Sequence, residues 1–209
     1  LIISHPGWGE SLFLKDIWPK SKLGIYCEFY YGFSADINFD PEFQTIDSLD
    51  FVRVKLKNMS SDMHFKIADK GISPTKWQAS TFPKQFLSNI SVIHDGIDTD
   101  RLIPNSSAKI LVGKKIKIAA DDEIITFVNR NLEPYRGYHI FMRSLPKILS
   151  SNLNVRVLIV GDDDISYGAK APDGKSWKNI FANEIMPSLT PQQASRIYFL
   201  GTVPYDTYI

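Results

Sequence analysis

The sequence contains a single cysteine, Cys27, so it has no internal disulfide framework and suits a reducing compartment. The sequence also lacks an excess of charge of either sign. The balance of 24 Lys and Arg against 23 Asp and Glu leaves a formal net charge of +1, which predicts neither a nucleic-acid footprint nor a strong membrane field. No run reaches the roughly 18 apolar residues of a membrane span, and no signal-peptide pattern is present. These absences favour the cytoplasm, with peripheral contact to the inner face of the membrane left open.

Histidine is also scarce, and its four positions show no metal-ligand spacing such as His-x3-His. His64 and His139 fall within expected helices and are interpreted as ordinary helix residues. The run Asp162–Asp164 suggests metal binding, with a solvated loop in which one carboxylate caps the next element as the alternative. Cys27 lacks a recognisable His–Asn arrangement, which favours a buried structural thiol over catalysis. We predict no metal site and no cofactor.

The sequence does contain an alternation of short apolar, β-rich runs with segments of helical spacing. Its 44% apolar and 22% charged residues are ordinary for a globular protein, and 209 residues suffice for one large or two small domains. The alternation predicts parallel α/β layering. The expected strands are Leu1–Ile3, Leu23–Tyr31, Gly71–Pro74, Ile90–His94, Ile124–Val128, Asn154–Gly161 and Arg196–Leu200.

Helices are expected between these strands, together with long polar loops at residues 33–43 and 162–178. Ser48–Lys66 predicts a helix capped by Ser48 or Asp50, although Phe51–Lys57 also alternates as a strand does. The remaining helices are expected at Thr75–Phe86, with a break near Pro83, from Tyr138 to Leu145, and at Ser176–Met186.

The periodicity breaks in the middle of the chain. Lys109–Ala119 predicts a short hairpin around Gly113, whose lysines form a solvated face or, alternatively, a membrane or acceptor patch. We therefore expect two α/β lobes, at residues 1–100 and 123–209, joined by a connector at residues 101–122.

The most informative segment is the loop that follows the strand Ile124–Val128. It carries Arg130 and Arg136, and Gly137 then leads into a helix. Ligands bind at the carboxyl ends of strands in open α/β sheets, where helix N-termini attract anions. Guanidinium groups suit phosphate oxygens. The sequence thus indicates a phosphate site, with two arginines that merely face water as the alternative.

The order Arg-x5-Arg-Gly resembles an element of retaining glycosyltransferases of family 4, which have the GT-B fold. Val92–Pro104, a strand expected to be buried followed by Asp95-Gly96, is similar to the segment that closes their first domain. Asn154–Gly161 is similar to their next strand, and the turn from His5 to Glu10 to their His-Asp-Trp turn. The resemblance implies two Rossmann-like lobes, both incomplete.

In that family two cations hold the diphosphate of a nucleotide sugar without an essential metal, which implies this role for Arg130 and Arg136. Gly161 and Gly201 end expected strands at the same edge, where glycine permits close backbone approach or simply a turn. The loop containing Val203 corresponds to one that touches the nucleobase. His5 would orient the donor sugar; a capping or core histidine is the alternative.

The resemblance implies an internal fragment, because the family's glycine-bearing loop and its Glu-x7-Glu element have no counterpart here. We expect the fragment alone to be inactive. The full protein would transfer a hexose with retention to a glycan or lipid-linked acceptor, in bacterial cell-surface polysaccharide or glycolipid synthesis. The rival hypothesis is a non-catalytic nucleotide- or sugar-phosphate-binding module. No nucleic-acid partner is expected, and the oligomeric state is left open.

Overall fold

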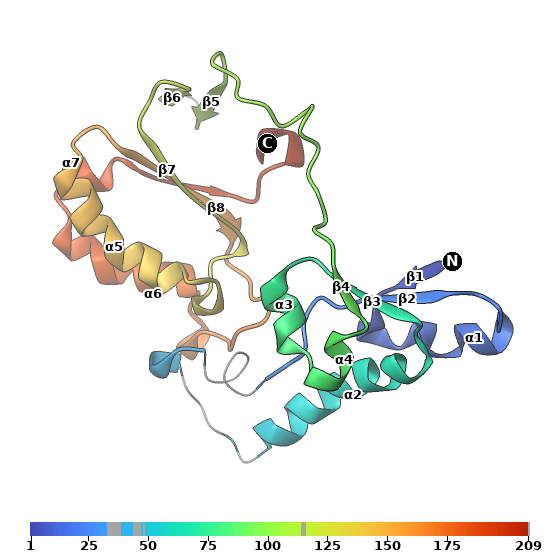
Figure 1. Ribbon diagram of the computed structural model, residues 1–209. Coiled ribbons are helices and arrows are strands. Elements are labelled where there is room, and N and C mark those ends of the chain that lie inside the picture. The colour runs from blue at the N-terminus through green and yellow to red at the C-terminus, as the bar shows by residue number, and fades with distance from the viewer. Residues whose placement is uncertain (33–38, 44–46, 48, 114–115, 209) are drawn as a thin grey trace. The chain divides into compact units, whose positions relative to one another are not determined.

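The computed structural model describes residues 1–32, 39–43, 47, 49–113 and 116–208. The chain forms two units, Leu1–Ile97 and Asp98–Ile209, each with its own sheet (Figure 1). The division falls between Ile97 and Asp98, so residues 98–122 belong to the second unit. Among the described residues, no helix has the length and apolar character needed to cross a membrane.

The first unit is built on four parallel strands in sequential order. They are β1 (Ile2–Ser4), β2 (Leu23–Tyr26), β3 (Lys70–Ser73) and β4 (Ile90–Val92). The predicted strand Leu23–Tyr31 is therefore too long, because regular pairing ends at Tyr26. The core contains Leu23, Ile25, Cys27 and Phe82, so Cys27 is a buried thiol as expected, and burial raises its pKa to about 12.

The expectation of a buried strand before Asp95 is wrong. Val92 and Ile93 are 46% and 56% exposed. In the described sheet β4 pairs with β3 alone, so it is an edge strand. A run of apolar residues shows β propensity, but it does not reveal whether other elements cover the strand.

The helices of the first unit are α1 (Leu14–Ile17), α2 (Asp50–Ile67), α3 (Lys76–Thr81) and α4 (Lys84–Leu87). Short 3-10 turns occur at Pro6–Trp8, Glu10–Phe13 and Pro41–Phe43. The break near Pro83 is confirmed. The ambiguous segment Phe51–Lys57 is helical, and α2 begins at Asp50 with Leu49 as its cap residue, so Asp50 is not the cap. Ser48 lies outside the described residues.

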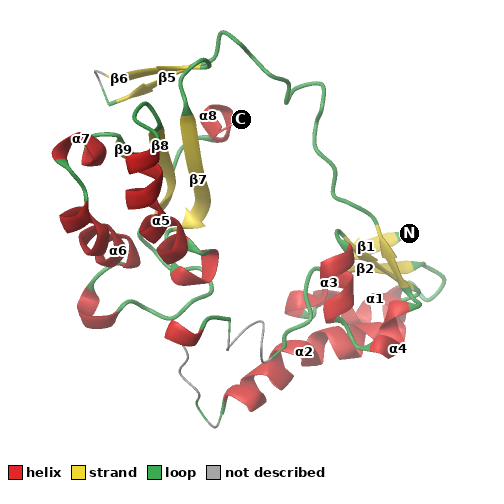
Figure 2. Ribbon diagram, turned by 60° about the vertical axis from the view of Figure 1, so that its left-hand side comes forward, coloured by secondary structure: helices red, strands yellow, loops and turns green. Residues whose placement is uncertain are grey.

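The second unit contains three parallel strands and an antiparallel hairpin. The strands are β7 (Ile124–Asn131), β8 (Arg156–Asp162) and β9 (Ile197–Gly201), and the hairpin joins β5 (Lys109–Val112) to β6 (Ile116–Ala119). The helices are α5 (Tyr138–Ser151), α6 (Trp177–Ile185), α7 (Pro191–Ala194) and α8 (Tyr205–Tyr208). Figure 2 shows α5 and α6 beside the strands. The remaining 3-10 turns are Pro134–Arg136, Pro172–Gly174 and Met186–Ser188.

The core of the second unit follows from the period of α5. Tyr138, Met142, Leu145 and Leu149 recur at helical spacing and are fully buried. The central strand β8 contributes buried Val157, Leu158 and Ile159 to the same interior. This packing fixes the strand ends from which the candidate site is built.

Candidate functional site

A hollow of about 240 Å³ lies where the three parallel strands of the second unit end. It brings together three residues that the sequence predicted, Arg130 near the end of β7, Gly161 in β8 and Val203 after β9. Arg130 was expected in the loop after the strand, but β7 continues to Asn131 and contains it. The other lining residues are Val128, Asn129, Asn131, Val160, Asp162, Thr202 and Tyr208. The hollow therefore occupies the sheet edge at which parallel α/β folds bind ligands.

Arg130 gives this hollow its cation. Its side chain is exposed, and among the described residues it has no ion-pair partner. Guanidinium groups stay protonated in proteins and offer five N–H donors in a planar fork. An anionic ligand in the hollow would therefore meet the positive charge of Arg130, with the carboxylate of Asp162 in the same lining.

The two glycines at the strand ends have different physical roles. Gly161 has φ of 151°, and a Cβ there would lie 2.9 Å from the Asn129 carbonyl oxygen and 2.8 Å from Leu132 Cδ2. Gly161 is therefore required by close packing of neighbouring strands. Gly201 has φ of 67° and no atom within 4 Å of its would-be Cβ, so a turn alone requires glycine there.

Arg136 is not among the residues that line this hollow. It ends the turn Pro134–Arg136, and its guanidinium carbon lies 5.1 Å from the centre of the Tyr167 ring. Its Nε is buried at 3.9 Å from Glu133 Oε1, beyond hydrogen-bond reach. The sequence thus places two cations in one loop, and the structure directs them to different neighbours.

Glu133 is the residue that sequence reasoning missed. Its side chain is fully buried, and its carboxylate accepts hydrogen bonds from the backbone N–H groups of Ser166 at 3.3 Å and Gly168 at 3.1 Å. Asn131 adds a side-chain hydrogen bond to Ser166 Oγ at 2.7 Å. The long loop after β8 is therefore fastened to the segment between β7 and α5, which carries Arg136. The only sequence signal was an acidic residue between Arg130 and Arg136.

The acidic run Asp162–Asp164 makes local hydrogen bonds. Asp162 Oδ1 and Asp164 Oδ1 each accept the next residue's backbone N–H at 2.8 Å, and Asp163 pairs with Lys178 at 2.9 Å. Within either unit, the described His, Cys, Asp and Glu side chains include no group of three placed to hold a metal ion. All three residues are exposed, as the alternative of a solvated loop expects, but none of them caps the next element, whose N-cap residue is Ala171.

The first unit has a separate hollow of about 160 Å³, and His5 is one of the residues that line it. Nδ1 of His5 accepts the backbone N–H of Gly7 at 3.0 Å, so the ring caps the turn Pro6–Trp8. The other nitrogen, Nε2, lies 3.2 Å from Glu28 Oε2 and carries the proton that it donates. His5 therefore caps the turn Pro6–Trp8 and also lines the hollow. The lining also includes Tyr26, Glu28, Phe29, Tyr31 and Lys57.

Tyr26 connects this hollow to the loop after β4. Its hydroxyl donates to both carboxylate oxygens of Asp95, at 2.8 and 2.9 Å. Desolvation and the Asp95 carboxylate raise the pKa of Tyr26 to about 12, so the phenol stays protonated at neutral pH. The Asp95-Gly96 turn of the sequence motif is thus tied to the hollow.

His64 is more than the ordinary helix residue that was expected. It is fully buried in α2, where Nδ1 lies 2.7 Å from the Ser60 carbonyl oxygen and Nε2 lies 2.6 Å from Ser11 Oγ. Ser60 Oγ also donates to the Pro6 carbonyl. These contacts hold the segment that carries His5 against α2.

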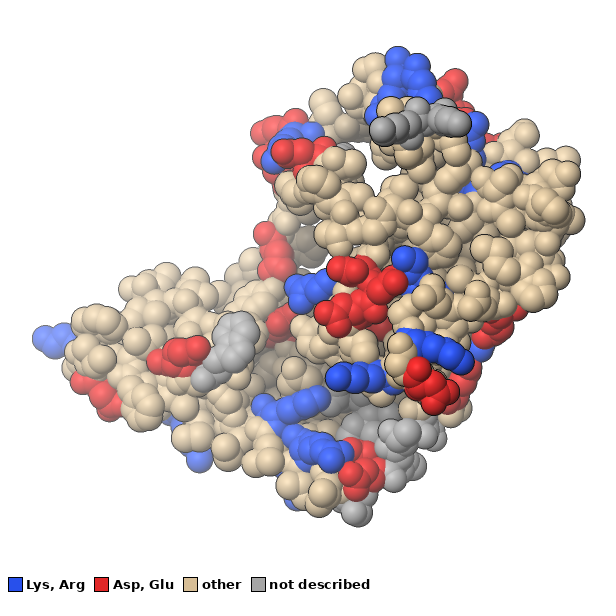
Figure 3. Space-filling model, turned by 180° about the vertical axis from the view of Figure 1, so that it is seen from behind, with Lys and Arg blue, Asp and Glu red and all other residues tan. Residues whose placement is uncertain are grey.

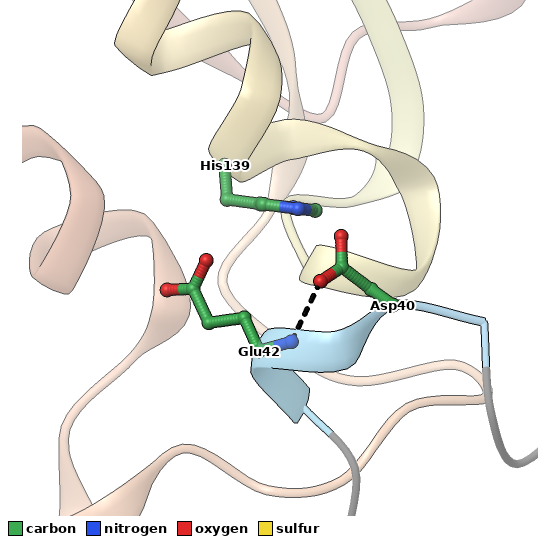
Figure 4. Close-up of side chains that lie close together, drawn as sticks. All are labelled: Asp40, Glu42 and His139. Carbon is green, nitrogen blue, oxygen red and sulfur yellow. Dashed lines mark hydrogen bonds between the residues drawn. The ribbon is translucent and has the colours of Figure 1, made fainter.

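Figure 4 shows His139 in the first turn of α5. It is buried, and its ring centre lies 5.8 Å from that of Phe181. The same figure draws the turn Pro41–Phe43 of the first unit, where the Glu42 backbone N–H donates to Asp40 Oδ1 at 2.9 Å. His139 thus packs within its own helical layer, as an internal helix residue does.

Residues 1–102 match a family model described as the glycosyl transferase family 4 group. That segment belongs to family 4. The match covers the first unit, including His5 and the Asp95-Gly96 turn, and confirms the family that the sequence motifs suggested. A comparison with curated protein sequences gives no match.

Solved structures extend the likeness to the whole chain. The crystal structure of TarM matches with a TM-score of 0.50 and 12% identity, over 99% of this chain and 33% of that one. An α,α-trehalose 6-phosphate synthase from Burkholderia multivorans matches with a TM-score of 0.51 and 11% identity, over 99% and 47%. At such identities the likeness shows the fold alone, which is GT-B. The chain spans a third to a half of these two structures.

Proposed function

We propose that the chain is part of a glycosyltransferase whose donor is a nucleotide-diphosphate sugar. The observation that supports this most is the convergence of Arg130, Gly161 and Val203 on one hollow at the ends of parallel strands. The diphosphate would lie beside Arg130, and the backbone after β9 would meet the nucleobase. Because the chain spans only part of its structural neighbours, the transfer reaction is proposed for the whole protein.

Arg130 would act on the leaving group. Negative charge develops on the diphosphate as the bond between the sugar and the diphosphate of the donor breaks. A fixed cation in the hollow would stabilise that charge without a metal. Arg136 is the proposed second cation. Its side chain is 33% exposed, which leaves part of the guanidinium open to a ligand.

His5 would orient the donor sugar in a retaining transfer. Since Nδ1 accepts the Gly7 N–H and Nε2–H donates to Glu28, the ring is not poised as a base. Its Nε2–H would reach a sugar hydroxyl in place of Glu28. The departing phosphate would then take the acceptor proton. We propose a glycan or lipid-linked acceptor in bacterial cell-surface polysaccharide or glycolipid synthesis, made in the cytoplasm.

Binding of nucleoside diphosphates tests the donor site. Calorimetric titration of the protein with UDP, GDP and ADP should identify one that binds. Each arginine supplies a charge-assisted contact of about 1.5–3 kcal/mol, so Arg130→Ala and Arg136→Ala should each weaken binding by about tenfold or more.

The matched control is Arg143→Ala, which removes an arginine paired with Glu184 in the same unit and should leave binding unchanged. If neither arginine variant differs from the wild type, the donor-site assignment is wrong. Nucleotide binding without turnover of any nucleotide sugar by the whole protein would instead favour the non-catalytic module.

A further inference from the structure

The ring of Tyr167 lies against the guanidinium of Arg136. The guanidinium carbon is over the ring, 5.1 Å from its centre, within the range in which an aromatic face attracts a cation. The tyrosine belongs to the long loop after β8, and it is 63% exposed. Packing in the core cannot explain a ring that is so exposed.

Glu133 fixes the backbone on both sides of this tyrosine. The buried carboxylate accepts the N–H groups of Ser166 at 3.3 Å and Gly168 at 3.1 Å, the residues that precede and follow Tyr167. Gly168 passes so close that a Cβ there would lie 3.0 Å from Glu133 Oε2. Since both of its neighbours are anchored, the backbone of Tyr167 has little freedom and its ring is presented at a fixed place.

The same carboxylate also faces Arg136. Oε1 of Glu133 lies 3.9 Å from Arg136 Nε, which is buried. The arginine side chain is 33% exposed, and because Nε is buried the exposed part lies elsewhere on it. The carboxylate and the aromatic ring therefore confine the guanidinium from two sides and leave part of it open.

The placement of single cations matters in this chain because its charges are balanced. Lys and Arg number 24, and Asp and Glu number 23. Figure 3 shows Lys and Arg side chains interspersed with Asp and Glu on the face that it presents. A diphosphate would therefore be held by individually oriented cations and not by a broad basic field.

We propose that Tyr167 is a positioning residue for Arg136, and that Glu133 holds it in place through the backbone of residues 166–168. The ring restricts the guanidinium to an orientation from which its open N–H groups meet the diphosphate of the donor. The long side chain is then ordered on folding and not on binding, which favours affinity. This inference rests on the proposed function, because it takes Arg136 as the second cation of the diphosphate site.

Direct stacking of Tyr167 on a nucleobase or a sugar of the ligand is the alternative role. The surroundings of the ring favour positioning. Arg136 is over the ring, and the centre of the Tyr135 ring lies 6.4 Å from its centre. The two roles differ in one measurable respect, which is whether the effect of Tyr167 on binding depends on the presence of Arg136.

Calorimetric titration with UDP, GDP or ADP, whichever binds the wild type, measures this dependence. Tyr167→Leu should weaken binding about fivefold, because it removes the aromatic face and frees the arginine. Tyr167→Phe keeps the ring and should bind as the wild type does. In the Arg136→Ala background, Tyr167→Leu should have no further effect, since no guanidinium is left to position.

A second measurement needs no ligand. Exchange of the Arg136 Nε–H with water, followed by NMR, should be slow in the wild type because this atom is buried. Tyr167→Leu should accelerate the exchange, and Tyr167→Phe should not. The matched control is Tyr198→Leu, the same substitution at a tyrosine of β9, which should change neither the exchange nor the binding.

The proposal is overturned if Tyr167→Leu binds the nucleotide as the wild type does, or leaves the exchange slow. An equal loss of affinity in the Arg136→Ala background would also overturn it, because Tyr167 would then contact the ligand or merely support the loop. If Arg130→Ala weakens binding and Arg136→Ala does not, the donor site stands and this inference alone falls. Absence of binding by all three nucleotides would overturn the proposed function and this inference together.

Discussion

Nε2 of His64 lies 2.6 Å from Oγ of Ser11, and both side chains are buried. The opposite ring nitrogen faces the Ser60 carbonyl at 2.7 Å, and a carbonyl can only accept a hydrogen bond. Nδ1 therefore carries a proton, and Nε2 shares a hydrogen bond with the Ser11 hydroxyl. The imidazole thus joins α2 to the turn Glu10–Phe13.

His64→Ala should lower the free energy of unfolding by about 1–3 kcal/mol, because it leaves the buried Ser11 hydroxyl and Ser60 carbonyl without this partner. Urea denaturation measures the change. His94→Ala, at an exposed histidine, is the control and should have little effect. Equal stability of both variants would mean that water replaces the imidazole at no cost.

The environment of Asp69 should make the stability of the fold depend on pH. Lys15 lies 2.7 Å from its carboxylate and the Leu23 N–H donates to it at 2.8 Å, and these contacts hold the pKa of Asp69 well below its usual range. A carboxylate with a lowered pKa stabilises the fold above the ordinary value of about 4. That contribution is lost as pH falls below it.

Asp69→Asn should therefore lower the melting temperature near about pH 7, and the difference from the wild type should shrink below about pH 4. Thermal melts across this range test the sign. Asp16→Asn, at an exposed carboxylate of the same unit, is the comparison. If the difference in melting temperature between Asp69→Asn and the wild type stays constant or grows on acidification, the lowered pKa of Asp69 is contradicted.

Glu133→Gln should loosen the loop after β8. It removes the charge that strengthens the hydrogen bonds from the Ser166 and Gly168 backbone N–H groups, and hydrogen bonds to charged groups are worth about 1.5–3 kcal/mol. Hydrogen exchange at those two amides should speed up. Glu184→Gln alters a surface partner of Arg143 and should leave both amides unchanged.

Gly161→Ala and Gly201→Ala should differ in cost. At position 201 only the positive φ is unfavourable to alanine, which costs about 1–2 kcal/mol. At position 161 the new Cβ also meets a backbone oxygen at 2.9 Å, which cannot move aside without shifting β7. Chemical denaturation of both variants should show the larger loss for Gly161→Ala, and the reverse order would contradict this account of the strand ends.

Local patterns predicted the elements that bury a regular apolar face. The helical spacing of Tyr138, Met142 and Leu145 and the β-branched run in Asn154–Gly161 correspond to α5 and β8. Arg130, Gly161 and Val203 could be placed together because strands that alternate with helices end at the same edge of a sheet. Neither inference requires knowledge of distant contacts.

The remaining features depend on partners that are remote in sequence. Glu133 accepts hydrogen bonds from residues 33 and 35 positions away, and His64 is hydrogen-bonded to a residue 53 positions away. The apolar spacing of α2 would ordinarily indicate the buried side of a helix, whereas here it faces outward. The prediction that Val92 is buried was wrong for the same reason, since composition does not say which strand lies at the edge of a sheet.

The attachment of α2 has an evolutionary consequence. Buried polar residues and the packing of Phe65 and Ile67 against the core hold the helix in place, so the side chains on the opposite face contribute little to folding. Substitutions there should be nearly neutral for stability and could change what the helix adheres to. One scaffold could in this way acquire, lose or exchange a surface preference by mutation of a few outward positions.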